Sequence, residues 1–419
     1  MNDAPIDLMR EAEAEAMATP LEDIQLAMPH RFKSNTMWPF FTRIRREDPV
    51  HYCRDSEFGP YWSITKYKDI MAVDTNHQAF SSEAGIGGIT IRDQAQDFIM
   101  PMFIAMDPPK HDAQRVTVSP IVAPGNLAKL EGIIRERAAK ILDSLPRNES
   151  FDWVDLVSIE LTTQMLATLF DFPFEERRKL TRWSDVATAA PGMGVVETEE
   201  QRRAELMECA GYFMGLWNQR INSNTPGNDL ISMMAHSDAT RNMDKMEFLG
   251  NIILLIVGGN DTTRNSLTGG LLAFSQNPDQ WAKLKANHDL LDSTIPEIIR
   301  WQTPLAHMRR TCVKDTEVGG KMIKAGERVV MWYVSGNRDE EAIENPNAFI
   351  IDRKRPRQHL SFGFGIHRCV GNRLAEMQLK IVWEEILKRD LDIEVLAEPE
   401  RVYSTFVKGY TSMPVRING

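Results

Sequence analysis

The sequence predicts a mainly α-helical protein with small β-sheets, an α+β fold in one domain that spans residues 1–419. Three observations predict it. Apolar residues recur at helical spacing over residues 127–145 and 156–170. A further predicted helix of about 32 residues would span roughly 48 Å at 1.5 Å per residue. Extended segments are short, and we expect the first of them as a pair of strands over residues 49–65.

Composition limits the function classes. The chain has 419 residues, 42% of them hydrophobic, and a net charge of −10, which speaks against non-specific nucleic-acid binding. Its four cysteines are scattered, as in proteins of a reducing cytosol. The acidic start lacks the pattern of a secretory signal. The longest aliphatic run, Ile252 to Val257, is far shorter than the ~20 residues of a membrane helix. We therefore expect a soluble cytoplasmic protein without stable membrane insertion.

Before residue 120 the pattern changes several times. Residues 1–35 read as an extension that is helical in part, and a helix is predicted over residues 66–76. Residues 81–102 are rich in Gly, Ile and Met without periodicity, which predicts a long loop. Pro109 suits the first turn of a helix that would place His111 and Arg115 four residues apart on one face.

The longest predicted helix begins near Asp244, a plausible N-cap, and stops before Pro278. Its centre reads Gly-Gly-Asn-Asp-Thr-Thr over residues 258–263. Two glycines in a buried helix cost roughly 1 kcal/mol each relative to alanine. A flat ligand beside Gly258 would explain that cost, and the Thr262 hydroxyl can loosen the local helical hydrogen bonds.

The remaining elements follow in order. Glu297 and Arg300 lie three apart on a predicted helix and so on one face. Residues 316–331 read as a hairpin that turns at Lys-Ala-Gly-Glu, residues 324–327. Final strands are predicted around residues 391–395 and 402–417.

A glycine-rich loop at residues 359–375 closes on Cys369 and runs into a helix. Glycines let the backbone pass close to a flat object, and a helix N-terminus favours a thiolate. Zinc would need three or four protein ligands, and no second cysteine or close-spaced histidine pair stands nearby in the sequence to supply them. A single axial thiolate on a haem iron fits better, which makes Cys369 the candidate metal ligand.

This loop, F-G-F-G-I-H-R-C-V-G from Phe362 to Gly371, resembles the haem-ligand loop of the cytochrome P450 superfamily. The resemblance implies the cytochrome P450 fold, with haem b (iron protoporphyrin IX) between the long distal helix and the proximal cysteine loop. It implies the following cofactor-binding residues: His111, Arg115, Gly258, Arg310, Phe362, His367, Cys369 and Gly371. Arg309 is a weaker candidate than its neighbour Arg310.

The resemblance also implies roles in catalysis and in substrate binding. Asp261 would relay protons from solvent, and Thr262 would hydrogen-bond the activated oxygen. Glu297 and Arg300 would form a buried structural pair locked to the loop before the cysteine. The candidate substrate-binding residues are Ile91, Met100, Leu254, Val257, Leu305, Met308 and Phe406.

Within the superfamily, segments such as F-I-A-M-D-P-P-K-H resemble the soluble bacterial alkane and fatty-acid terminal (omega) hydroxylases. This resemblance implies an oxidoreductase that inserts one oxygen atom from O2 into the terminal C–H bond of a medium-length apolar chain. Electrons would come from a ferredoxin and its NAD(P)H-dependent reductase, because the chain has no flavin or nicotinamide fingerprint. A basic run at residues 353–357, with Arg368 and Arg373, would suit docking of an acidic partner. We expect a monomer.

Four alternative functions differ from this one in features that the sequence shows. The substrate could be another hydrophobic molecule, terpene or sterol-like. A peroxide-driven hydroxylase would usually lack the Asp261–Thr262 pair. A non-catalytic haem-thiolate sensor or carrier would need no proton relay. A cysteine hydrolase that pairs Cys369 with His367 is disfavoured, because one tight loop leaves little room for a substrate between the two.

Overall fold

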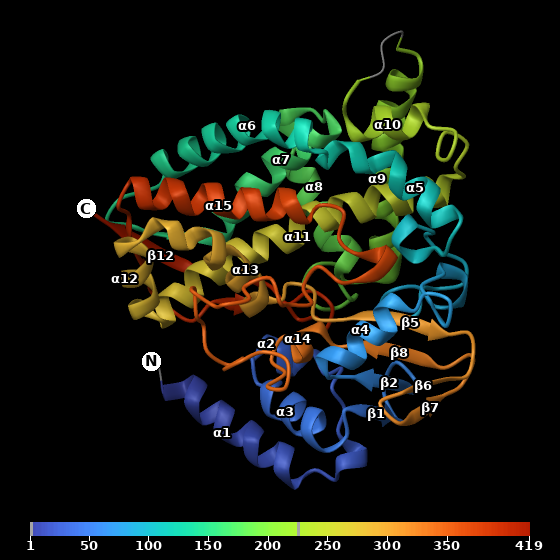
Figure 1. Ribbon diagram of the computed structural model, residues 1–419. Helices are drawn as coiled ribbons and strands as arrows, with labels where there is room; N and C mark the ends of the chain where they lie inside the picture. The colour runs from blue at the N-terminus through green and yellow to red at the C-terminus, as the bar shows by residue number, and fades with distance from the viewer. Residues whose placement is uncertain (1–2, 224–226) are drawn as a thin grey trace.

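A computed structural model describes residues 3–223 and 227–419, and a long helix, α11, runs through its centre (Figure 1). It comprises Lys245–Gln276, 32 residues. The carboxylate of Asp244 accepts two backbone N–H groups of the first turn at 2.8 and 2.9 Å, and the helix ends before Pro278. The predicted bounds are confirmed, because both are set by local signals, a side-chain cap and a proline.

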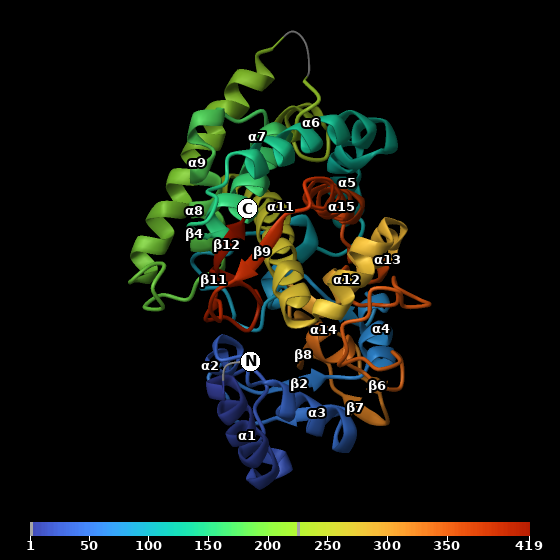
Figure 2. The same ribbon diagram turned by 90° about the vertical axis from the view of Figure 1, so that its left-hand side faces the viewer.

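Other helices surround α11 and bury its apolar sides. Figure 2 shows α9 on one side of α11 and α15 on another. Their apolar faces and α11 form one large hydrophobic core. The helices that pack on α11 are α7 (Glu160–Phe170), α8 (Arg178–Thr188), α9 (Glu199–Ile221), α12 (Pro278–Ala286), α13 (Leu291–Gln302) and α15 (Asn372–Lys388).

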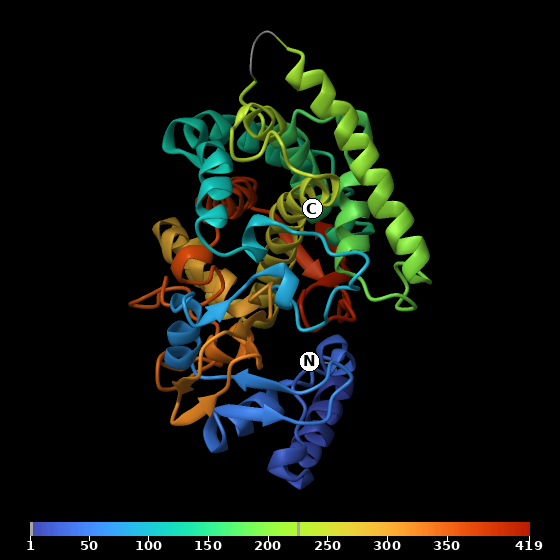
Figure 3. The ribbon, with the colours of Figure 1, turned by 90° about the vertical axis from the view of Figure 1, so that its right-hand side faces the viewer.

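A five-stranded sheet lies at the other end of the molecule, in the strand-rich part below the helices in Figures 1 and 3. Its strand order is β1-β2-β8-β5-β3. Strands β2 and β8 are parallel, and the other neighbours are antiparallel. The strands are β1 (Val50–Cys53), β2 (Tyr61–Ile64), β3 (Phe80–Ser81), β5 (Met308–Cys312) and β8 (Arg328–Met331).

The N-terminal extension packs against this sheet end. Helix α1 (Asp3–Ala18) contacts α3 (Trp38–Glu47) and buries Ala12 and Ala16. Trp332 joins the same hydrophobic cluster from the end of β8. The expectation that residues 1–35 are helical in part is confirmed for the described residues.

The rest of the chain forms small sheets and further helices, of which α6 (Pro124–Asp143) has 20 residues. Three further sheets are small, with orders β4-β12-β9, β10-β11 and β6-β7. The remaining elements are α2 (Pro29–Lys33), α4 (Tyr67–Thr75), α5 (Lys110–Val118), α6 (Pro124–Asp143), α10 (Leu230–His236), α14 (Tyr333–Gly336), β4 (Ser150–Asp152), β6 (Thr316–Val318), β7 (Lys321–Ile323), β9 (Asp392–Val395), β10 (Glu400–Arg401), β11 (Tyr410–Ser412) and β12 (Pro414–Asn418).

The predicted hairpin over residues 316–331 is wrong in its turn. The two paired strands are β6 and β7, which turn at Gly319 and Gly320, both with positive φ. Residues 324–327 instead lead into β8, which pairs with β2 and β5. Both turns contain glycine, and the pairing of β8 with strands distant in sequence decides between them. In the described part of the chain, no helix has the length and apolar character needed to cross a membrane.

Candidate active site

Cys369 lies at the start of α15, at the end of the glycine-rich loop. Its backbone N–H donates to the Phe362 carbonyl at 2.8 Å, which closes the loop. Water reaches the Cys369 side chain, although the protein around it is dense enough that burial raises the pKa of the thiol. The Gly371 backbone N–H and the positive charges of Arg115 and Arg368 oppose this shift, because each stabilises the thiolate.

The physical reason for a glycine differs between three positions of this site. Gly365 has φ of 67°, and a Cβ there would lie 2.7 Å from the Asp74 carbonyl oxygen, so the loop and α4 leave no room for a side chain. A Cβ at Gly258 or at Gly371 would meet no protein atom within 4 Å. Protein packing therefore explains Gly365 but gives no reason for glycine at the other two positions.

The middle of α11 is partly accessible. Gly258 is exposed, and Leu254 and Thr262 are half-buried, as are Leu255, Val257 and Gly259, whereas Ile256, Asn260 and Asp261 are buried. Leu254, Gly258 and Thr262 are four apart and therefore share one face. The Thr262 hydroxyl donates to the Gly258 carbonyl at 2.9 Å. This face combines one apolar side chain, one residue without a side chain and one hydroxyl.

Asp261 points to a different side of α11. Its side chain is 1% exposed, and Oδ1 accepts from the Ser184 hydroxyl and contacts Arg264 Nη2, each at 3.0 Å. Arg264 also pairs with Asp185 at 3.0 Å. The other oxygen, Oδ2, is buried without a protein donor. Burial raises the pKa of Asp261, and the positive charge of Arg264 opposes that shift.

Four basic side chains converge near the cysteine loop: His111 and Arg115 of α5, Arg310 of β5 and His367 of the loop itself. His111 and His367 lie with ring centroids 4.4 Å apart. Burial lowers the pKa of His367 to about 2, and the positive charges of Arg310, His111 and Arg115 contribute. His111 Nε2 and His367 Nδ1 are buried without a hydrogen-bond partner. We call these four residues the basic cluster.

Arg310 has a partner within the protein that the sequence did not predict. Its Nη2 contacts Asp74 Oδ1 at 2.9 Å, and both side chains are at most 2% exposed. Asp74 Oδ2 accepts from the Tyr333 hydroxyl at 2.9 Å and from the Phe364 N–H at 2.8 Å. Arg309 instead pairs with Asp93. The position of Asp74 one turn after buried Ile70 is a signal that could have identified it as an inward-facing acid.

Glu297 and Arg300 form a buried ion pair with two contacts of 2.8 Å. Arg300 also donates to carbonyls of the loop before the cysteine, including Pro346 at 2.8 Å. Arg353 donates to Glu297 at 2.8 Å. We call Glu297, Arg300 and Arg353 the carboxylate-arginine group.

The candidate substrate-binding residues are distributed over three hydrophobic clusters. Leu254, Val257 and Met100 belong to the helical core, and Leu305, Met308 and Phe406 belong to the cluster of the sheet. Ile91 packs in the N-terminal cluster instead. Its backbone N–H donates to His307 Nε2 at 3.2 Å.

The chain is similar to known proteins over most of its length. A family model described as Cytochrome P450 matches residues 200–406. Linalool 8-monooxygenase from Pseudomonas putida is 33% identical over 407 residues, which cover 94% of this chain and 99% of that protein. The chain belongs to the cytochrome P450 family.

One further related protein and two solved structures are also similar to this cytochrome P450. Methyl-branched lipid omega-hydroxylase from Mycobacterium tuberculosis is 30% identical over 390 residues, 90% of each chain. CYP153D17 from Sphingomonas sp. PAMC 26605 has 51% identity and a TM-score of 0.87, covering 94% of this chain and 98% of that one. Cytochrome P450-153 from Novosphingobium aromaticivorans has 46% identity and a TM-score of 0.88, with coverage of 94% and 99%.

The residues present fit the family's cofactor, haem b. The orphaned nitrogens of His111 and His367 suit an anionic partner, as the two propionates of haem are. At Gly258 and Gly371 protein packing does not require glycine, which fits a flat group lying against both. This cytochrome P450 is therefore a haem-thiolate monooxygenase.

Proposed function

We propose that this cytochrome P450 hydroxylates the terminal carbon of an apolar chain, either a medium-length alkane or a fatty acid. The observation that carries the proposal is the separation of two faces of α11. The accessible face holds Leu254, Gly258 and Thr262, whereas Asp261 faces a buried polar network. An apolar substrate and a supply of protons can thus approach the same helix turn from different sides.

Cys369 would bind the haem iron through its sulfur, and the basic cluster would bind the propionates. When bound, the haem supplies dioxygen activation and transfer of one oxygen atom into a C–H bond. Arg115 and the Gly371 N–H would stabilise the thiolate at Sγ. Arg310 would contribute while it remains paired with Asp74.

Protons would reach the accessible face through α11. Asp185 is 34% exposed, and its contact with Arg264 leads to Asp261, whose Oδ2 has no protein donor. A carboxyl whose pKa is raised by burial can hold a proton and release it. Thr262 would then hold the proton at Oγ1 on the face where the substrate binds.

Position on the chain would be selected by orientation. A terminal methyl C–H bond is stronger than an internal methylene C–H bond, so the pocket must present the chain end. Apolar walls that admit only that end would do so. The proposed walls are Leu254 and Val257 on α11 together with residues from other segments. These are Ile91, Met100, Leu305, Met308 and Phe406. The omega-hydroxylase named above supports this preference.

Electrons would come from a ferredoxin and its NAD(P)H-dependent reductase. Lys354, Arg355, Arg357, Arg368 and Arg373 are exposed around the cysteine loop, and a cluster of one sign on an acidic protein favours docking of an acidic partner. Arg353 is not part of this surface, because Glu297 binds it.

A second candidate substrate is a terpene alcohol. Linalool 8-monooxygenase, at 33% identity, supports it. The two proposals differ in the shape of the molecule that the apolar walls admit, a linear chain or a branched one.

The deciding experiment is turnover with a defined panel. Purified holoenzyme, a ferredoxin, its reductase and NADH are incubated with linear alkanes, fatty acids and linalool, and mass spectrometry locates the hydroxyl group. We expect primary alcohols from the linear chains. Hydroxylation mainly at internal carbons, or of linalool alone, would refute the proposal.

Substitution of Cys369 tests the metal ligand. The reduced wild-type protein under carbon monoxide is expected to show the red-shifted Soret band of thiolate ligation, and Cys369→Ala is expected to lack it. Cys312→Ala is the matched control, because Cys312 is a buried cysteine in β5. Retention of the band in Cys369→Ala would disprove the assignment.

Substitution of Thr262 tests the proton path. In Thr262→Ala we expect product per NADH to fall roughly a hundredfold, the low end of the contribution of one positioned proton donor, with hydrogen peroxide accounting for the lost electrons. Thr263→Ala, the adjacent buried threonine on another helix face, serves as control. Equal coupling in both variants would argue against the role of Thr262.

A further inference from the structure

A cavity of about 610 Å³ lies where α1 and α3 meet the ends of α11 and α13. Leu272 and Gln276 line it from the last turns of α11. Gln276 stands 14 residues beyond Thr262, roughly 21 Å along the helix at 1.5 Å per residue. This cavity is therefore separate from the accessible face of α11. Its size falls within the usual range of small-molecule sites.

The lining carries an excess of positive charge. Of its basic residues, Arg43 pairs with Glu47, Arg46 with Glu340 and Arg401 with Glu398. Arg338 and Lys408 differ from these three. Within residues 3–223 and 227–419, Arg338 bonds only to carbonyls, those of Pro346 at 3.0 Å and Trp301 at 3.3 Å.

Lys408 is likewise without an ion pair in the described part of the chain, and its Nζ donates to the Gln302 carbonyl at 2.8 Å. Glu13 is the one further acid in the lining besides Glu47. Two cations thus share the inner end of the cavity without a carboxylate between them.

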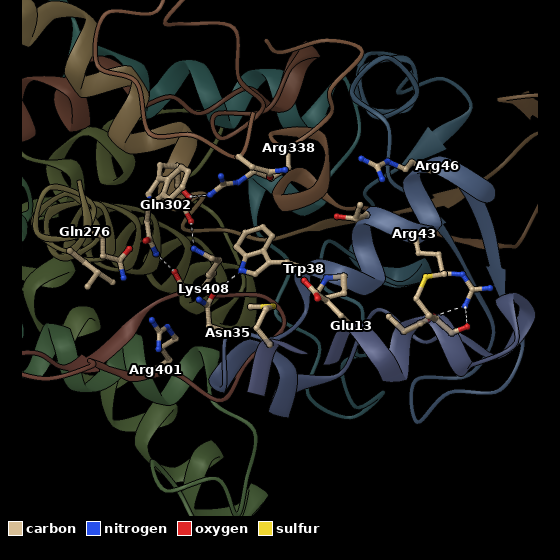
Figure 4. A pocket seen from close by; sticks show the side chains of 18 of the residues that line it. Glu13, Asn35, Trp38, Arg43, Arg46, Gln276, Gln302, Arg338, Arg401 and Lys408 are labelled. Atoms are coloured by element: carbon tan, nitrogen blue, oxygen red, sulfur yellow. Dashed lines mark hydrogen bonds between the residues drawn. The ribbon is translucent and has the colours of Figure 1, made fainter. Parts of the chain in front are cut away.

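Tryptophan rings fix the positions of both cations. The Arg338 guanidinium lies 3.8 Å from the Trp301 ring centroid and 4.9 Å from that of Trp38. Lys408 Nζ lies 5.7 Å from the Trp38 centroid. Figure 4 shows both side chains beside Trp38. Arg338 is 6% exposed, so this arrangement keeps a cation out of bulk water with aromatic faces as its neighbours.

The cost of this arrangement points to a missing anion. Burial, with the positive charges of Arg338 and Arg401, lowers the pKa of Lys408 well below its usual range. Burying a cation without a counter-charge is unfavourable. A bound oxyanion would offset that cost at both residues, and Arg offers a fork that matches carboxylate and phosphate oxygens.

We propose that this cavity binds a small molecule whose carboxylate or phosphate group lies between Arg338 and Lys408. The carbon part of the ligand would lie along Met9, Met17 and Leu272, which line the same cavity. Lys408 and Tyr410 both bind Gln302, by 2.7 and 2.8 Å hydrogen bonds, so the loop that carries Lys408 is fixed to α13 before a ligand arrives.

Calorimetric titration of the holoenzyme tests this site with three probes. Benzoate represents a carboxylate, inorganic phosphate represents a phosphate, and benzamide is the neutral isostere of benzoate. We expect saturable 1:1 binding of at least one of the two anions, no binding of benzamide and an unchanged Soret band. Which anion binds distinguishes the two ligand sources.

Variants of Lys408 make the test specific. In Lys408→Met we expect roughly tenfold weaker binding, about 1.4 kcal/mol, whereas Lys408→Arg and the rim control Arg46→Gln should bind within a factor of about three of wild type. Arg338→Gln is less suitable, because Arg338 also holds two carbonyls and the variant can fail to fold.

Four outcomes would overturn the proposal. They are the absence of saturable binding of either anion up to about 10 mM, equal binding by Lys408→Met, equal binding of benzamide, and a Soret shift that places the probe at the haem.

Discussion

The carboxylate-arginine group and the basic cluster are both buried sets of charged side chains, and they differ in whether the protein completes them. Glu297 is 0% exposed, and its oxygens accept from Arg300 and Arg353. The remaining Arg300 donors reach backbone carbonyls. The hydrogen-bonding groups of Glu297, Arg300 and Arg353 are thus satisfied within the described part of the chain. Their contacts hold the loop before the cysteine to α13.

The basic cluster contains four groups that attract anions, and only Arg310 has a buried carboxylate partner, Asp74. His111 and His367 each keep one buried ring nitrogen without a partner. Because buried polar groups are usually satisfied, an incomplete set indicates where a ligand belongs. The difference teaches that burial of charged side chains alone does not mark a functional site; at the basic cluster the unmet ring nitrogens coincide with the neighbourhood of Cys369.

Removal of Glu297 should have the largest effect. Glu297→Ala would leave Arg300 and Arg353 buried without their counter-charge, which costs about 3–5 kcal/mol of unfolding free energy. Urea unfolding followed by circular dichroism measures it. The exposed pair of Glu136 with Lys140 provides the control, and Glu136→Ala should leave the free energy of unfolding nearly unchanged. Similar losses in both variants would remove the basis for calling the group structural.

Removal of a basic-cluster charge should affect haem retention more than folding. In Arg115→Gln we expect a loss of about 1.5–3 kcal/mol of haem affinity, the worth of a hydrogen bond to a charged group. Faster haem transfer to apomyoglobin would measure it, with little change in apoprotein stability. Arg310→Gln is the informative contrast, because it also leaves Asp74 unpaired and should destabilise the apoprotein. If Arg115→Gln unfolds the apoprotein as Glu297→Ala does, the distinction between the two groups fails.

His307 provides the smallest test. Both ring nitrogens are satisfied, by the Thr405 carbonyl at 2.7 Å and the Ile91 N–H at 3.2 Å, and burial lowers its pKa to about 4. Between pH 6.5 and pH 4, His307 is protonated in the unfolded chain but stays neutral in the folded chain. His307 therefore stabilises the fold above pH 6.5, and this contribution falls by at most about 1.4 kcal/mol per unit as pH drops toward 4. Unfolding free energies of wild type and His307→Gln at pH 7 and pH 5 check it, and parallel pH dependence would contradict it.

Features governed by neighbouring residues were predictable from the sequence. The bounds of α11 follow from Asp244 and Pro278, and the strand pair β1–β2 follows from a local Gly-Pro turn. The convergence of His111 and His367 followed from the family resemblance, since their 256-residue separation leaves no local signal.

Features governed by distant contacts were not predictable. Asp74 lies in a helix with polar neighbours, and no pattern in that segment indicates that Asp74 contacts Arg310. The same holds for Arg338 and Lys408, 70 residues apart, which share the Trp38 ring. The prediction of the hairpin turn was wrong for the same reason, because β8 pairs with β2 and β5, which are distant in sequence. Individual roles of the predicted site residues stay predictions for the experiments above.

Asp74 joins four chain segments, and this has a consequence for biosynthesis. Its partners Arg310, Tyr333 and Phe364 follow it by 236, 259 and 290 positions. At 5–20 residues per second, the ribosome needs about 15–60 s to supply the last of them. In the nascent chain, α4 must therefore wait for segments that are synthesised much later before this junction can close.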